Sequence, residues 1–527
     1  MPGRDGRLVL AVDLGSSGVK VGVATVLGEV LHWTYRPLTT DLGPGGAATQ
    51  DAEEWWRCVV DAARQCLAEG PGAGARVAAV GVTGQWASTV PVDAAGRPVG
   101  ACLMWSDTRG APYSRGVVGG RVQGYNARAL ATWVRRTAGI PSTSGADPVG
   151  HLLHLRYGDP QTARAARWFL EPVDHLAMRF TGVPAASPAS MTAAWLTDNR
   201  HPELLAYDPV LVDRAGVDGD KLPPLMPTGT VIGPVTPAVA DELGIAPTAA
   251  VVTGLPDLHS SAVGSGCVRE REAHLSIGTT AWVSCPLPRK HTDLVRQMAT
   301  VPGIGPEPYL LGNNQETAGR CLQWLRDVQP GAPSYDELVA LAATAPPGSG
   351  GVLFTPWLAG ERSPVDDRAA RGGFHNLSLS TTRADLVRAV LEGVAYNARW
   401  LLEGADHVAG GRLTPVRVVG GGAQSLLWCQ VLADVWGRPV GRVADPLLTG
   451  VRGTALAAGR ALGALAWDDI RDLVPVDAHL EPRAVEAATY ARLFAEFPGL
   501  YKRQRRMFTR LNSRAGTSSP PGRRTHA

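Results

Sequence analysis

The chain has 527 residues, of which 45% are hydrophobic and 19% charged, with 51 Lys and Arg against 48 Asp and Glu. This length predicts several domains, the hydrophobic share excludes a disordered chain, and the near balance of charge argues against a nucleic-acid partner. No run of 18 apolar residues occurs, and Asp13 comes too early for a secretory signal. Seven scattered cysteines without a C-x-x-C pair favour reduced thiols, so we expect a cytoplasmic protein with no membrane partner.

The first elements predict an α/β architecture. Residues 8–13 and 19–25 are β-branched runs joined by a turn with Gly15, which is typical of a hairpin. A helix is expected from Asp51, which with Glu54 forms a variant of the capping box. The strand 76–82 follows, and strands that alternate with helices indicate an α/β fold. The apolar face expected for the helix comprises Trp55, Val59, Ala62 and Cys66.

A similar pattern returns near the middle of the chain. Residues 275–283 align with residues 12–20, because both show a strand, then Gly-hydroxyl-hydroxyl-small, then a second strand. Two such elements, each opening about half of the chain, predict two related domains that face a shared cleft.

The second half carries two further helix signals. A helix over 382–404 is expected to begin at Thr382, with Asp385 completing a capping box. The strand 416–419 runs into three glycines, after which Ser425 is the expected N-cap of another helix. From residue 512 onward the chain is rich in Pro, Ser and Arg, which predicts a disordered tail.

Three glycine-bearing turns are candidate phosphate sites. Glycine beside Ser or Thr lets the backbone approach an anion, and the hydroxyls add donors. Each turn is also compatible with an ordinary tight turn that binds nothing. There is no Walker P-loop, because none of the four lysines follows a glycine, so a nucleotide would need another device. The three turns are Gly15-Ser16-Ser17, Gly278-Thr279-Thr280 and Gly420-Gly421-Gly422.

Two acidic residues stand beside these turns. Asp13 ends the first strand next to the first turn, where it could hold Mg²⁺ or simply cap its own turn. Asp257 follows an apolar strand and Gly254, which suits a general base for a substrate hydroxyl or an ordinary helix N-cap. We assign no role to His259. Glu361 and Arg362 are expected to form an ion pair.

Seven short segments, in this order and at these intervals, resemble the FGGY carbohydrate kinases, which include xylulokinase, glycerol kinase and ribulokinase. The resemblance runs from about Leu8 to about Phe508. The segments are Asp13-Leu-Gly-Ser-Ser, Trp105-Ser-Asp107-Thr-Arg109, the loop of Asp257, Ser276-Ile-Gly-Thr-Thr, Gly360-Glu361-Arg362-Ser-Pro364, Leu391-Glu-Gly-Val-Ala-Tyr396 and Gly420-Gly-Gly-Ala-Gln-Ser425.

The resemblance implies an α/β fold of two actin-like, ribonuclease H-like ATPase domains with ATP, Mg²⁺ and a sugar in the central cleft. It implies an N-terminal acceptor domain over 1–267, a nucleotide domain over 268–511 and a tail over 512–527. Asp257 and Asp13 match the catalytic acids of the family, Asp13 being the one near the metal. The residues that match nucleotide contacts are Ser16, Ser17, Lys20, Gly278, Thr279, Gly319, Gln323, Gly421, Gly422 and Ser425.

The departures from the family fall in the sugar pocket. Xylulokinases have Gln-Met-His-Gly, and glycerol kinases Gln-Arg-Glu-Thr, where this chain has Gln85-Trp86-Ala87-Ser88. The amide that usually follows the base is here Leu258. We expect the indole of Trp86 to pack on a C–H face of the acceptor, or else to turn into the core. The residues expected at the acceptor are Gln85, Trp86, Ala87, Asp107, Asp257 and Leu258.

The function expected is ATP-dependent phosphorylation of a hydroxyl of a small sugar or polyol, such as xylulose or a related ketose. Two alternatives stay open: a kinase for a less polar small molecule, and a catalytically silent actin-like module that binds sugar or ATP. A homodimer is compatible with the sequence but has no specific signal in it.

Overall fold

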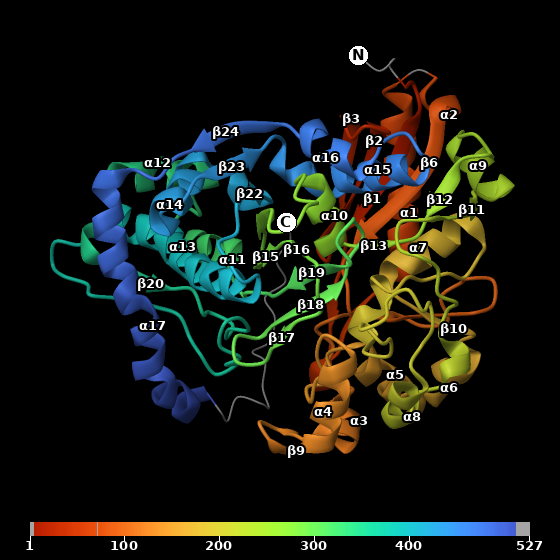
Figure 1. Cartoon of the computed structure of the whole chain (residues 1–527), viewed down its shortest axis with the longest axis horizontal. Helices are drawn as coiled ribbons and strands as arrows, with labels where there is room; N and C mark the ends of the chain where they lie inside the picture. The colour runs from red at the N-terminus through yellow and green to blue at the C-terminus, as the bar shows by residue number, and fades with distance from the viewer. Residues whose placement is uncertain (1–4, 71, 513–527) are drawn as a thin grey trace.

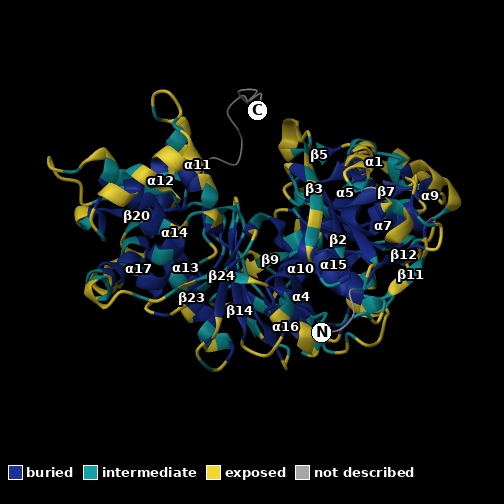
Figure 2. Ribbon diagram, turned by 90° about the horizontal axis from the view of Figure 1, so that it is seen from above, coloured by how far each residue is buried: buried dark blue, intermediate teal, exposed yellow. Residues whose placement is uncertain are grey.

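The computed structural model describes residues 5–70 and 72–512. Its elements form two halves, each built around a mixed β-sheet, with the N-terminal half on the right of Figure 1 and the C-terminal half on the left. The predicted α/β class is confirmed. Figure 2 shows buried residues filling both halves and continuing between them, where α10 (Asp257–Gly264) and α15 (Thr449–Ala461) lie.

The N-terminal sheet has the strand order β11-β12-β6-β1-β2-β3, with β13 paired to the end of β6. β1 pairs antiparallel with β2, which confirms the predicted hairpin, and parallel with β6. β1 is almost wholly buried because helices cover both faces of the sheet, and this explains its nearly unbroken apolar sequence. The strands are β1 (Leu8–Leu14), β2 (Gly18–Thr25), β3 (Val30–Pro37), β6 (Val77–Gly84), β11 (Val231–Pro234), β12 (Ala250–Val252) and β13 (Leu255–Pro256).

Alternate residues of β1 enter two different cores. Leu8, Leu10 and Val12 pack with α1 (Ala52–Ala68), α7 (Pro172–Thr181) and α9 (Pro237–Leu243). Val9 and Ala11 pack on the opposite face with α15, which comes from the C-terminal half of the sequence. The two halves of the chain therefore share a core.

α1 begins differently from the prediction. Its predicted apolar face is buried, but Asp51 caps the helix by accepting a hydrogen bond from the Glu53 N–H at 2.9 Å. Glu54 does not complete a capping box, because its carboxylate accepts the Thr39 hydroxyl at 3.3 Å instead.

The C-terminal sheet has the order β15-β14-β22-β23-β24. β14 forms an antiparallel hairpin with β15 and pairs parallel with β22, the same arrangement that β1 has with β2 and β6. The predicted repeat is thus confirmed at the level of strand pairing. The strands are β14 (Ala273–Ile277), β15 (Ala281–Ser284), β22 (Val416–Val419), β23 (Val440–Val443) and β24 (Val476–Leu480).

Helices on this sheet begin where the capping signals predicted. Thr382 and Asp385 form a full capping box at α13 (Arg383–Val408), and Ser425 caps α14 (Leu426–Trp436) by accepting the Trp428 N–H. The local sequence thus decides these two helix starts. The other helices here are α11 (Gly319–Asp327), α12 (Tyr335–Thr344), α16 (Trp467–Leu473) and α17 (Ala484–Asn512).

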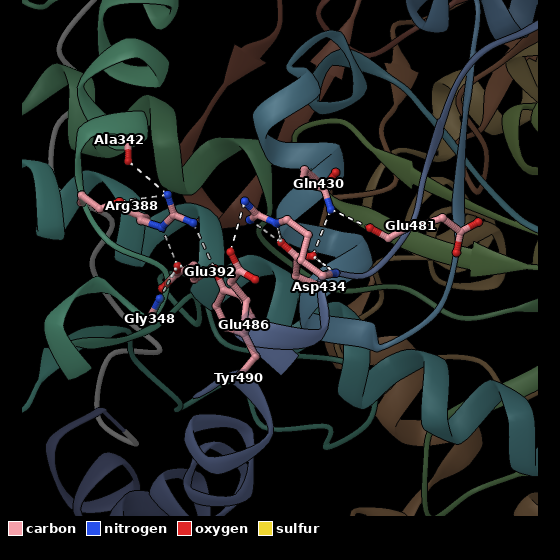
Figure 3. A network of polar contacts seen from close by, with 11 residues as sticks. Ala342, Gly348, Arg388, Glu392, Gln430, Asp434, Glu481, Glu486 and Tyr490 are labelled. Atoms are coloured by element: carbon pink, nitrogen blue, oxygen red, sulfur yellow. Dashed lines mark hydrogen bonds and ion pairs between the residues drawn. The ribbon is translucent and has the colours of Figure 1, made fainter. Parts of the chain in front are cut away.

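α17 is attached to α13 and α14 by a buried polar network, shown in Figure 3. The Glu392 carboxylate accepts the Arg388 guanidinium at 2.7 Å and the Tyr490 hydroxyl at 2.8 Å. Asp434 accepts the Arg483 Nε at 3.0 Å just before α17 begins. Residues 513–527 of the predicted tail lie outside the described residues, whereas Asn512 still belongs to α17.

The remaining elements are short. Within the described residues no helix is both long and apolar enough to cross a membrane, and all seven cysteines are free thiols. The remaining helices and strands are β4 (Asp41–Leu42), β5 (Ala48–Gln50), α2 (Ala73–Arg76), β7 (Val90–Val92), β8 (Cys102–Leu103), α3 (Ala111–Val118), β9 (Gly119–Val122), α4 (Ala127–Arg136), α5 (Pro148–Gly158), α6 (Pro160–Ala165), β10 (Trp168–Leu170), α8 (Pro209–Ala215), β16 (Pro286–Leu287), β17 (Thr292–Asp293), β18 (Met298–Pro302), β19 (Tyr309–Gly312), β20 (Leu353–Thr355) and β21 (Gly373–His375).

Candidate active site

A cavity of about 1680 Å³ opens between the two halves. Its walls come from the turns of both hairpins, the residues after β6, the start of α10, and the loop between β22 and α14. The structure brings to this cavity every residue that the sequence analysis assigned to the nucleotide: Ser16, Ser17, Lys20, Gly278, Thr279, Gly319, Gln323, Gly421, Gly422 and Ser425.

In the β1–β2 turn the backbone carbonyls of both serines accept hydrogen bonds from elsewhere in the protein. The Gly15 N–H donates to Gly18 O at 2.9 Å and closes the turn. The carbonyl of Ser16 accepts the Gln50 amide at 2.7 Å, and that of Ser17 accepts the Tyr35 hydroxyl at 2.8 Å. Within the described chain neither serine hydroxyl has a hydrogen bond, so both are available to an anion in the cavity.

The β14–β15 turn is held by the start of α11. The Gly319 N–H donates to Gly278 O at 2.9 Å, and the Ala318 N–H donates to Thr279 O at 3.0 Å. A side chain at position 319 would put its Cβ only 2.5 Å from Gly278 O, so glycine is required there. Gln323 lies one turn further along α11 and also faces the cavity.

The triple-glycine loop packs against the end of β14. Gly420 has φ +86°, and a Cβ there would lie 2.7 Å from Ile277 O. A Cβ on Gly422 would lie 2.5 Å from the Ile277 side chain. Packing against β14 therefore requires both glycines, and the backbone of this loop lines the cavity wall.

Asp13 stands where β1 meets the first turn. Its Oδ2 is 3.2 Å from Nζ of Lys20, its register partner on β2, and the charge of Asp13 raises the pKa of Lys20. A Cβ at Gly450, in the first turn of α15, would lie 2.7 Å from Oδ2. Only glycine at 450 leaves space beside this carboxylate.

This space fits a magnesium ion bound together with phosphates. Among the described residues no three His, Cys, Asp or Glu side chains gather as a complete metal site. Mg²⁺ is commonly held by one or two carboxylates while substrate phosphates and waters supply the other ligands. Asp13, whose Oδ1 has no hydrogen bond within the described chain, matches that mode.

Asp257 is the first residue of α10, and Pro256 occupies the N-cap position, so the alternative that Asp257 is the N-cap is wrong. Its Oδ1 accepts the N–H of Leu258 at 2.8 Å. Burial, and then the negative charge of Asp13, raise the pKa of Asp257 to about 7. A carboxyl with that pKa is half ionised near neutral pH, which suits a general base.

Beside Gln85 and Asp257 the cavity has an apolar wall. Trp86, Ala87 and Leu258 line it, and Trp86 and Leu258 pack in one apolar cluster with Trp195 and Trp282. The single donor of Trp86, Nε1, is bonded to Ser190 O at 2.7 Å. Its ring therefore faces the cavity as surface without a free donor.

Gln85 and Asp107 differ in their placement. Gln85 lines the cavity and donates its amide to Gln50 at 3.1 Å. Asp107 does not reach the cavity wall: it is fully buried and accepts the Arg109 guanidinium at 2.7 Å and the Ala48 N–H at 3.0 Å. The hydrogen bonds of its carboxylate stabilise the 105–109 turn.

The expected pair of Glu361 and Arg362 is wrong. The Arg362 Nε instead pairs with Glu316 at 2.5 Å, and the guanidinium also lies 5.7 Å from the ring centre of Trp105 across the cleft. Glu361 is buried and accepts the backbone N–H groups of Glu316 and Arg362, and burial raises its pKa to about 7.

Several cavity residues were missed by sequence reasoning. Trp195 lies between α7 and α8, and Thr449 and Gly450 come from α15. Trp195 is near none of the motifs. The pair Thr449-Gly450 at the start of this small-residue helix was a visible signal, because it joins a glycine to a hydroxyl residue, as the two hairpin turns do.

Comparisons with known proteins agree with this geometry. The sequence models of the FGGY family of carbohydrate kinases match residues 8–264 with the N-terminal domain and residues 273–462 with the C-terminal domain. The xylulose kinase of Staphylococcus epidermidis is 26% identical over 505 residues, covering 95% of this chain and 98% of that protein. The gluconokinase of Bacillus subtilis is 23% identical over 517 residues, covering 95% and 97%. A ligand-bound xylulose kinase from Lactobacillus acidophilus has the same fold, with a TM-score of 0.84 at 20% identity over 96% of this chain and 100% of that one.

Proposed function

The chain belongs to the FGGY family of carbohydrate kinases, and we propose that Asp257 is the base with which it phosphorylates a small sugar or polyol. It is an ATP-dependent phosphotransferase with an alcohol acceptor, and the expected actin-like fold is confirmed. One observation carries the choice of base: an Asp257 carboxyl with a pKa of about 7 faces the same cavity as both hairpin turns.

The turns of the two hairpins hold the phosphates of ATP. The hydroxyls of Ser16, Ser17 and Thr279 and the ammonium of Lys20 supply donors and positive charge, which is what a loose phosphoryl-transfer transition state requires. Gly319, Gln323 and the Gly421–Gly422 wall hold the rest of the nucleotide, with Ser425 fixing the start of α14.

Asp13 would hold Mg²⁺, in the space that Gly450 leaves free. When bound, the ion neutralises charge on the phosphates. In the enzyme free of the ion, the charge of Asp13 also raises the pKa of Asp257, and Asp13 pairs with Lys20.

Asp257 accepts the proton of the attacking hydroxyl. Its Oδ1 is fixed by the Leu258 N–H, so Oδ2 is the oxygen free to take that proton. As the new bond between the acceptor oxygen and the γ-phosphorus forms, the bond to the ADP oxygen breaks and ADP leaves. Closure of the two halves excludes water that would otherwise hydrolyse ATP.

The protein selects its acceptor largely by the shape of the apolar wall and less by hydrogen bonds. The relatives are named for xylulose and gluconate, and this chain meets its acceptor with Trp86, Ala87 and Leu258. A site with few hydrogen-bonding groups rejects an analogue that lacks a hydroxyl only by roughly 10–200-fold. We therefore infer a ketose or polyol acceptor for which one hydroxyl is dispensable, with D-xylulose a secondary substrate.

The domain division follows the same proposal. Residues 1–267 supply the acceptor pocket, the base and the first phosphate turn, and residues 268–511 supply the rest of the nucleotide site, with α15 crossing back to the N-terminal sheet.

The test is a coupled ADP-release assay with D-xylulose, D-ribulose, gluconate, glycerol and 1-deoxy-D-xylulose. We expect at least one to raise ADP release far above the rate without acceptor, and the deoxy analogue to be used within about 200-fold of its parent. If no acceptor raises ADP release although ATP binds, the chain is a silent ATP-binding module. Strong rejection of the deoxy analogue would contradict the shape-reading pocket.

A further inference from the structure

The backbone of Ala87 is strained at the cavity wall. It has φ +62°, a left-handed conformation that costs any residue with a Cβ. Strained residues persist where the surrounding structure fixes them, and they cluster at functional sites. Ala87 follows Trp86 in the acceptor wall, so whatever fixes Ala87 also sets the direction of that indole.

A buried carboxyl beneath the loop fixes it. The strands β7 and β10 pair antiparallel with Leu170 opposite Val90, which brings Glu171 level with the end of the 85–89 loop. Glu171 is 2% exposed, and its Oε2 accepts the Ser88 N–H at 3.2 Å. The Ala87 N–H is also directed at this carboxyl and lowers its pKa, against the larger upward effects of burial and of Asp174.

The other attachment of the indole comes from Ser190, near a second buried acid. Asp174, one helical turn after Glu171, is fully buried and lies near Ser190, but neither of its carboxylate oxygens has a hydrogen-bond partner among the described residues, and the Ser190 hydroxyl donates to Ser187 O at 3.1 Å. The carbonyl of Ser190 is the group that accepts the Trp86 Nε1–H at 2.7 Å. The two contacts that hold the acceptor loop, from Glu171 to Ser88 and from Ser190 to Trp86, therefore both lie near the start of α7.

We propose that Glu171 is a positioning residue for the acceptor, because it fixes the strained Ala87–Ser88 backbone and thereby aims Trp86 into the cavity. This rests on the proposed function, since it assigns the 85–88 loop to the acceptor. Glu171 lies outside the cavity wall and touches no reactant, so its effect passes entirely through the loop.

The proposal is tested with Glu171→Met and Glu171→Gln, using whichever of D-xylulose, D-ribulose, gluconate, glycerol and 1-deoxy-D-xylulose the wild type uses best. Methionine removes the hydrogen-bond acceptor at similar volume, and we expect the KM for the sugar to rise at least tenfold while the KM for ATP stays within twofold. Glutamine keeps an acceptor oxygen, so Glu171→Gln should stay within threefold of wild type in both constants. Glu272→Met is the control: Glu272 is also buried and accepts a backbone N–H, that of Arg269 at 3.3 Å, away from the cavity, and it additionally pairs with Arg471 at 3.3 Å, so this variant sets an upper bound on the effect of structural loss alone.

An unchanged sugar KM in Glu171→Met would overturn the proposal, as would equal increases in both KM values, which indicate a merely structural role. If Glu171→Met does not fold, Glu171→Asp withdraws the carboxyl by one methylene and must give the same selective rise. These outcomes can be distinguished from failure of the proposed function, because in that case the wild type itself phosphorylates no acceptor of the panel.

Discussion

Replacing Asp13 with asparagine should change how activity depends on pH. Asp257 can act as a base only when ionised, and its pKa is about 7. A base with that pKa is about 9% ionised at pH 6 and about 91% at pH 8, so kcat/KM of the wild type should rise about tenfold between these values. The second cause of the raised pKa is the charge of Asp13.

Asp13→Asn removes this charge and keeps the shape of the side chain. Burial remains, so the pKa of Asp257 should fall to a value between about 3.9 and 7. The ratio of kcat/KM at pH 8 to that at pH 6 should then shrink from about tenfold toward unity. This ratio is internal to the variant, so it is insensitive to the separate loss of rate that we expect when the metal ligand is removed.

The assay is ADP release at pH 6, 7 and 8 with both Mg-ATP and acceptor limiting, so that kcat/KM reports the enzyme free of the ion. Asp336→Asn is the charge-matched control, because Asp336 also lines the cavity but is not among the causes of the Asp257 shift. A ratio in Asp13→Asn equal to that of wild type and control would refute the coupling of the two carboxyls.

Three further predictions concern the cavity. Gly450→Ala should lower turnover at least tenfold with little loss of stability, because the alanine Cβ would lie 2.7 Å from Asp13 Oδ2. A fully active variant in the same ADP assay would show that the reaction does not use the space beside Asp13. Trp86→His should shift preference toward more hydroxylated ketoses at a nearly unchanged melting temperature, whereas lost stability with unchanged preference would make Trp86 a core residue. Asp257→Asn should stabilise the fold at pH 8 by up to about 4 kcal/mol and not at pH 4. The native state keeps the proton of Asp257 between pH 4 and 7, where the unfolded state has lost it, so the free energy of unfolding of the wild type falls as pH rises through that window. Thermal melts at both pH values check the sign.

Local signals made much of the fold predictable. The hairpin β1–β2 and the starts of α13 and α14 depend on residues close in sequence, and the structure has them where the sequence indicated. The repeated hairpin also predicted a shared cleft, and the two turns do face one cavity.

Contacts between distant segments were not predictable in the same way. Gly450 approaches Asp13 from the far end of the chain because α15 crosses to the N-terminal sheet, and nothing near either residue encodes that crossing. Asp107 was expected at the acceptor, but its neighbour Arg109 binds its carboxylate within the same turn. The side chains of Glu361 and Arg362 do not pair, because Glu316 comes from another loop: its carboxylate binds the Arg362 guanidinium and its backbone N–H donates to Glu361.

The most direct test of the account is the turnover of Asp257→Asn with saturating ATP and the best acceptor. Asparagine keeps the size of the side chain and an oxygen for the Leu258 N–H but cannot take a proton. We predict that ATP still binds, that turnover falls by about 10² to 10⁴-fold, and that the rise in activity between pH 6 and pH 8 disappears. Turnover within threefold of wild type, with the same rise, would show that another group is the base.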